Sequence, residues 1–171
     1  LPRSATRMEA LLCGTPNPDT SDEKNTCATD NIANPDNLSV VDDHALLFIG
    51  EDASDQHEND YLWAYDLNTG NLTRILTSVY GAEVTSTYWY PSVNGHAYLV
   101  ANVQHPYLES DEDKVSNPYS EGGAGYIGYF TLPAANIAGK QLSFQEVPVP
   151  TSEQAQSENI GAMSVEACAA E

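Results

Sequence analysis

The sequence has few positively charged residues. Six Lys and Arg stand against 25 Asp and Glu, which gives a formal net charge of −19. Binding a nucleic-acid backbone takes several Lys or Arg side chains, so we expect no nucleic-acid partner. Two interpretations of the acid excess stay open. The acids serve solubility in a salty or extracellular setting, or some of them collect divalent cations, which prefer oxygen ligands.

Long hydrophobic runs are also lacking. Apolar pieces such as ALLFIG at 45–50 are far shorter than the about 20 residues of a membrane-spanning helix, so we expect no membrane span. The sequence opens on Leu1 with neither Met nor a signal peptide. That opening is typical of a processed chain or of a part of a longer protein.

Cysteine is scarce, with only Cys13, Cys27 and Cys168. The first two flank a segment rich in Pro, Asp, Asn and Thr, where a disulfide would replace a missing core. The alternative is two unrelated buried thiols. Cys168 is then free or bonded outside the chain, and the spacing does not favour a zinc site. A disulfide indicates an oxidising compartment, so the expected location is secreted or periplasmic.

Short runs of β-branched, aromatic and aliphatic residues recur after the first 37 residues. They predict eight strands, near 38–41, 45–50, 61–67, 72–76, 84–90, 97–103, 126–130 and 142–147. Asp66–Gly70 and Asn94-Gly95 predict hairpin turns, because glycine readily adopts a positive φ. With no convincing helix between the strands, the pattern indicates an all-β fold.

The predicted organisation has three parts. Residues 1–37 form a disulfide-pinned loop and blade entrance, 38–147 form antiparallel β blades, and 148–171 form a peripheral tail. Consecutive hairpins suit about two four-stranded blades of a β-propeller, although a sandwich also fits. Two blades cannot close a propeller, so the missing part or a partner chain completes it.

No catalytic motif is recognisable: the sequence lacks GxSxG, HExxH and a glycine-rich phosphate loop. Acids and amides near strand ends are the better candidates. They are Glu9, Asp36, Asn37, Glu51, Asp52 and Glu83. Strand ends meet at the mouth of a propeller, and clustered carboxylates repel one another unless a cation neutralises them. Such ligands suit calcium, and hard iron as well.

Four short motifs, NPDNL, GEDAS, GAEVTS and VQHP, follow one another along the chain, and RMEAL precedes them. In this order they resemble the PhoX-type alkaline phosphatases and their uncharacterised relatives, over about Arg7 to Pro106. The resemblance implies the C-terminal part of a secreted six-bladed propeller. It also implies an iron and calcium cluster on the top face that hydrolyses phosphate monoesters.

Residue by residue, the resemblance implies that Glu9 and Glu83 are metal ligands. A looser match extends this role to the acidic strand-end motifs, namely Asp36, Asn37, Glu51 and Asp52. Gln104 and His105 match the Gln-His-Pro element, which we interpret as supporting the ligands or as structural. The chain also departs from the family. An upstream Asn-Cys-Ala-Gly-Gly run is absent, and no Arg stands just before Glu83.

Three functions follow as expectations. The first is part of a phosphate-ester hydrolase that is inactive as this chain alone, with the rest of the propeller or a second chain as partner. The second is a non-catalytic extracellular module stabilised by calcium. The third is a calcium-dependent phosphotriesterase or lactonase on a similar propeller.

Overall fold

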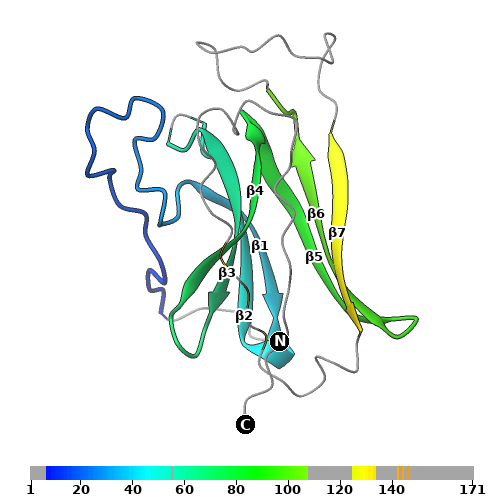
Figure 1. Ribbon diagram of the computed structural model, residues 1–171. Helices are drawn as coiled ribbons and strands as arrows, with labels where there is room; N and C mark the ends of the chain where they lie inside the picture. The colour runs from blue at the N-terminus through cyan, green and yellow to red at the C-terminus, as the bar shows by residue number, and fades with distance from the viewer. Residues whose placement is uncertain are drawn as a thin grey trace.

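Seven β-strands in two antiparallel sheets make up the fold (Figure 1). The structure is a computed structural model that describes residues 7–54, 56–107 and 125–133, with 142, 144 and 146 as single residues. No α-helix occurs in these ranges, and none of their helical turns has the length or hydrophobicity needed to cross a bilayer. The all-β prediction is confirmed.

The first sheet is a four-stranded meander in the order β1-β2-β3-β4. Its strands are β1 (Pro35–Val41), β2 (Leu46–Glu51), β3 (Asn59–Asp66) and β4 (Leu72–Tyr80), and the short 3-10 turn η1 (Asp42–His44) joins the first two. Asp66 organises the β3–β4 turn, because its Oδ1 accepts the backbone N–H groups of Asn68 and Thr69 at 2.8 and 3.1 Å. Gly70 closes that turn with a φ of 77°, as its sequence predicts.

The second sheet has three strands in the order β5-β6-β7. They are β5 (Glu83–Val93), β6 (His96–Gln104) and β7 (Tyr126–Pro133). Asn94 and Gly95 both take positive φ angles, 51° and 81°, between the paired residues Val93 and His96. This two-residue turn matches the right-handed twist of the strands, so the predicted Asn-Gly hairpin is confirmed.

The main hydrophobic core lies between the two sheets. It takes residues from β2, β3, β4, β5 and β6, including Phe48, Leu62, Ile75, Val84 and Leu99, which are all nearly or fully buried. Successive side chains of a strand point to opposite faces, so each sheet has an inner face on this core and an outer face.

The outer face of the first sheet is covered by the N-terminal segment, residues 7–34, which runs along it in blue (Figure 1). A second buried cluster forms there, made of Ile32, Leu47, Ile49, Tyr61, Trp63 and Tyr65. Leu12 of the segment packs against this cluster. Residues 7–34 therefore cover a sheet face, which explains how a segment without regular strands is held, while residues 35–37 of the predicted loop already belong to β1.

Seven of the eight predicted strands coincide with β1–β7, with ends that differ by a few residues. Of the eighth, only three residues are described: Leu142 and Phe144 pack on the main core, and Glu146 pairs with Arg74. The tail 148–171 lies outside the described residues.

The two described cysteines, Cys13 and Cys27, are free, so the structure lacks the disulfide expected between them. Cys27 pairs instead with Pro16, three residues beyond Cys13, and its N–H donates to the carbonyl of Gln56 at 3.0 Å. Pro16 therefore occupies the position opposite Cys27, and Cys13 lies three residues before it in the chain. Hydrogen bonds hold the loop in place of a disulfide. Cys168 lies outside the described residues.

Candidate metal centre

Direct backbone contact joins the end of β2 to the start of β5. A Cβ atom on Gly50 would overlap the carbonyl oxygen of Val84, so only glycine lets the two strands approach this closely. Asp52 stands two residues after Gly50, and Glu83 stands just before Val84. The contact therefore brings together two acids that are 31 positions apart in the sequence.

Asp36 reaches the same place through an irregularity in β1. Pro35 pairs with Glu51 and Asn37 pairs with Gly50, so Asp36 is an extra residue without a partner in β2. A bulge of this kind bends the strand and redirects a side chain. It turns the Asp36 carboxylate toward the junction of the two sheets.

Asp36, Asp52 and Glu83 form the one group in the described ranges with the spacing of a metal site. One carboxylate oxygen from each residue lies within 4.8 Å of the other two. Calcium holds oxygen ligands at about 2.3–2.6 Å, so ligands on opposite sides of the ion stand about 4.6–5.2 Å apart. Three carboxylates at this spacing are a donor set that a hard divalent cation such as calcium can use.

Two side chains position Glu83, which is only 8% exposed. Gln104 Nε2 donates to Glu83 Oε2 at 2.7 Å, and His105 Nε2 lies 3.3 Å from the same oxygen. Gln104 is the cross-strand partner of Glu83 in the second sheet. These two contacts hold the Glu83 carboxylate in place beside the other acids. The expectation that Gln104 and His105 support the ligands agrees with these contacts.

The other two acids are held by short-range contacts. Asp52 donates its N–H to the carbonyl of Asn34 at 3.2 Å, and Asn34 Nδ2 donates back to the carbonyl of Asp52. Asn37 Nδ2 donates to Asp36 Oδ2 at 2.5 Å. Asp36 is exposed and Asp52 is half-buried, so the group opens to solvent on one side.

Glu51 points away from this group, although it is next to Asp52 in the sequence. It is fully buried on the outer face of the first sheet. Its Oε1 accepts hydrogen bonds from Ala33 N and Trp63 Nε1 at 2.8 and 2.7 Å, and its Oε2 accepts one from Tyr61 N at 3.0 Å. Glu51 is the last residue of β2 and shares the outer face with Leu47 and Ile49, whereas Asp52 lies just beyond the strand and reaches the junction.

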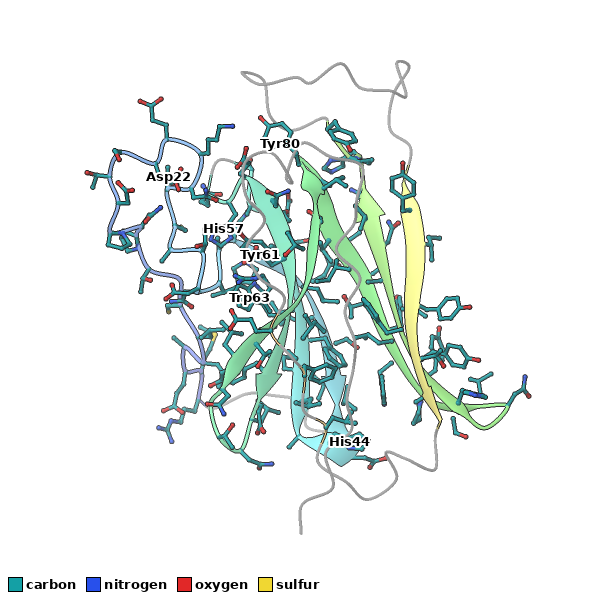
Figure 2. The ribbon with its side chains drawn as sticks, viewed as in Figure 1. Asp22, His44, His57, Tyr61, Trp63 and Tyr80 are labelled. Carbon is teal, nitrogen blue, oxygen red and sulfur yellow. The ribbon has the colours of Figure 1, made fainter. Side chains whose placement is uncertain are left out.

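His57 completes the surroundings of Glu51, close to Tyr61 and Trp63 (Figure 2). Its Nδ1 lies 3.0 Å from Glu51 Oε2, and its Nε2 lies 3.2 Å from the carbonyl oxygen of Ala28. The sequence shows four isolated histidines and gives no signal that this one meets Glu51 across a loop. Glu51 and His57 together attach the N-terminal segment to the first sheet.

Glu9 and Asn37 complete the set of predicted ligands. Glu9 is exposed, forms an ion pair with Arg7, and is not part of the acidic group. Asn37 is half-buried and bonds to Asp36, so it adjoins the group through that ligand. Of the six predicted ligands, the fold gathers Asp36, Asp52 and Glu83 at one point.

Each Arg or Lys in the described ranges forms an ion pair away from the group of Asp36, Asp52 and Glu83. Arg7 pairs with Glu9, and Lys24 pairs with Glu58 at 2.8 Å. Arg74 is almost fully buried on the outer face of the first sheet. Its guanidinium lies 4.8 Å from the centre of the Tyr61 ring, and it donates to Glu146 at 3.1 Å.

These neighbours also affect Tyr61. Burial raises the pKa of the Tyr61 phenol, the positive charge of Arg74 lowers it to a smaller extent, and Glu51 raises it. The folded protein therefore keeps the Tyr61 phenol protonated at pH values where a solvent-exposed tyrosine would lose its proton.

No protein-family model, curated protein or solved structure matches this chain. The case for a function therefore rests on the residues and their geometry.

Proposed function

We propose that this chain is the C-terminal portion of a secreted or periplasmic, PhoX-like metal-dependent phosphate-ester hydrolase. In this proposal Asp36, Asp52 and Glu83 hold calcium, and the chain is inactive alone. Four-stranded meanders such as β1–β4 suit propeller blades, and the missing blades come from the rest of the protein or from a second chain.

The convergence of the four motifs carries the proposal. NPDNL supplies Asp36, GEDAS supplies Asp52, GAEVTS supplies Glu83, and VQHP supplies Gln104 and His105. These motifs lie on β1, after β2, on β5 and at the end of β6, yet their polar side chains meet at one junction. Carboxylate oxygens are the hard ligands that calcium prefers, and the fold gathers three of them here.

The chemistry of the chain itself is limited to holding charge. A bound cation supplies Lewis acidity toward a phosphoryl oxygen. The three carboxylates bind that cation, and Gln104 and His105 orient Glu83. A phosphoryl-transfer site also needs positive groups on the transferred oxygens, and Arg7, Lys24 and Arg74 are all engaged away from the junction. The other portion of the protein has to supply them.

A second candidate is favoured by this same shortage of positive charge. As a non-catalytic extracellular module, the chain would use calcium to join its two sheets, because Asp36 and Asp52 belong to the first sheet and Glu83 to the second. The cation would then stabilise the fold and take no part in a reaction.

Calcium titration of the chelator-treated chain tests the site that both candidates share. We expect one bound calcium per chain, and at a hundredfold excess over its dissociation constant a gain of about 2.7 kcal/mol in the free energy of unfolding. Glu83→Gln should weaken calcium binding at least about tenfold. Glu9→Gln removes an equal charge from an exposed acid outside the group and should bind calcium normally.

Metal content separates the two candidates. Elemental analysis of the native protein should find iron with calcium if the chain belongs to a hydrolase, and calcium alone if it is a stabilised module. Hydrolysis of p-nitrophenyl phosphate should be absent for this chain alone with either metal. An unchanged calcium affinity in Glu83→Gln would overturn both candidates.

A further inference from the structure

The outer face of the second sheet is the third large hydrophobic surface of the molecule. Register places two rows of side chains on it, one through Tyr88, Val100 and Tyr129 and the other through Tyr90 and Tyr98. With Ile127 they form a surface that we call the tyrosine face. Side chains project from this side of the sheet, away from the first sheet (Figure 2).

The tyrosine face is uncovered by the described residues. Tyr88 and Tyr129 are 59% and 66% exposed, and Ile127 is 81% exposed. Each exposed tyrosine leaves roughly 100 Å² or more open, so the face offers on the order of 500 Å² before Tyr98 and Val100 are counted. That is comparable with the largest patches of typical monomers, and a stable interface buries about 800 Å² on each side.

Charge is absent from the tyrosine face. Strands β5, β6 and β7 contain one Asp, Glu, Lys or Arg, which is Glu83 at the first position of β5. In the whole chain 18% of the residues are charged. An antiparallel sheet that faces water normally presents polar side chains. Loss of charge together with enrichment in tyrosine is the composition of the centre of a protein interface.

We infer that the tyrosine face is the surface through which two copies of this chain associate, sheet against sheet about a two-fold axis. A chain of net charge −19 repels its own copies over most of its surface. The tyrosine face lets two copies approach without opposing carboxylates. A basic partner would instead be expected on the acidic surface.

The arrangement of the faces selects a symmetric contact. The inner faces of the two sheets pack on each other, and the N-terminal segment covers the outer face of the first. Along β1 the outer face of the first sheet stays exposed at Leu38 and Val40. Among the described residues, the outer face of the second sheet is therefore the one whole face left uncovered, so a second copy meets it with the same face. A sugar would need a flat platform, whereas the Tyr98 and Tyr129 rings meet at 62° and 5.5 Å. Two such uneven aromatic surfaces can interlock, as packed sheets do.

Sedimentation equilibrium of the whole chain tests this inference. We expect a dimer whose dissociation constant falls when the salt is raised from about 0.05 to 0.5 M, because salt screens the repulsion between the two acidic copies. Tyr129→Lys should raise the dissociation constant at least about tenfold. The added lysine reduces the net negative charge, so general electrostatics predicts the opposite change.

Val40→Lys is the matched control. Val40 is 58% exposed on the outer side of β1, and its replacement adds the same charge away from the tyrosine face. It should leave the dimer intact or strengthen it slightly. Tyr88→Lys, on a different strand, repeats the test should Tyr129→Lys fail to fold by circular dichroism.

Three outcomes would overturn the inference. They are a monomer at both salt concentrations, a dimer that Tyr88→Lys and Tyr129→Lys leave unchanged, and equal weakening by Val40→Lys. A monomer that binds soluble oligosaccharides through these tyrosines would also overturn it. The calcium site and the dimer have separate readouts, so either can fail while the other stands. A dimer through this face occupies the place where the next blade of a propeller would pack, so it would favour the non-catalytic module over the hydrolase.

Discussion

The outer faces of the two sheets are built from similar residues but have opposite surroundings. Tyr61 and Trp63 on the first sheet are each 1% exposed, whereas Tyr88 and Tyr129 on the second are mostly exposed. The first face is covered by the chain's own N-terminal segment, and no described residue covers the second. The aromatic residues of a strand therefore indicate that its sheet face is suited to burial, but they do not indicate which segment or partner covers that face.

Charged side chains also differ between the covered and the uncovered outer face. The covered face contains Glu51, His57 and Arg74, all buried and all bonded to the backbone of the N-terminal segment. These groups satisfy backbone donors and acceptors of a segment without regular strands, which would otherwise lose their partners on burial. The uncovered face has no such groups, because it has no irregular segment to hold.

The largest expected effect comes from removing the charge that holds the cover. Glu51→Ala leaves His57, Trp63 Nε1 and two backbone N–H groups without their shared acceptor. Breaking a buried pair in this way costs about 3–5 kcal/mol, so the free energy of unfolding should fall by that amount. Urea unfolding followed by tryptophan fluorescence measures it.

Glu9→Ala is the control for that experiment, because it removes an exposed acid and should change the free energy of unfolding by less than about 0.5 kcal/mol. A loss below about 1 kcal/mol for Glu51→Ala would contradict the role given to this carboxylate. Should the alanine variant not fold, Glu51→Gln replaces it in the same unfolding experiment, because glutamine keeps one acceptor oxygen and the size of the side chain.

A smaller effect is expected where the two sheets touch. Gly50→Ala forces the ends of β2 and β5 apart, because its Cβ overlaps the Val84 carbonyl. The cost should be about 1–3 kcal/mol, and calcium binding should weaken as Asp52 moves away from Glu83. Urea unfolding and calcium titration measure the two consequences.

Gly128→Ala makes the same change in the second sheet, where nothing lies within 4 Å of the added atom. It should leave stability within about 0.5 kcal/mol and calcium binding unchanged. If both glycine variants bind calcium as the wild type does, the contact between β2 and β5 does not position the acids.

The smallest effect concerns pH, and it tests how completely the first outer face is covered. The raised pKa keeps Tyr61 protonated in the folded protein, while the unfolded phenol loses its proton above about pH 10. Above that pH the unfolded state binds fewer protons, so the free energy of unfolding falls by about 1.4 kcal/mol per pH unit until the folded pKa is reached.

Tyr61→Phe removes this dependence. The wild type should lose more stability than the variant between about pH 10 and 11, and the two should show no such divergence near neutral pH. Urea unfolding at each pH gives the comparison. Parallel curves would show that the Tyr61 phenol reaches solvent and that the N-terminal segment does not seal this face.

The sequence by itself determined the strands and their hairpins. Short runs of β-branched, aromatic and aliphatic residues favour strands, and Asn94-Gly95 and Asp66–Gly70 favour tight turns. All of these are local signals, which a sequence shows directly. The same local signals placed acids near strand ends, and so identified Asp36, Asp52 and Glu83 among six candidates.

Only the tertiary structure decided between neighbours in the sequence. Glu51 and Asp52 look alike in the sequence, but Glu51 ends β2 under the N-terminal segment, whereas Asp52 lies just beyond the strand at the junction. A bulge at Asp36 and a glycine contact at Gly50 then bring three strands together. These are long-range events, and a sequence period cannot show them because it reports which residues share a face and not which faces meet.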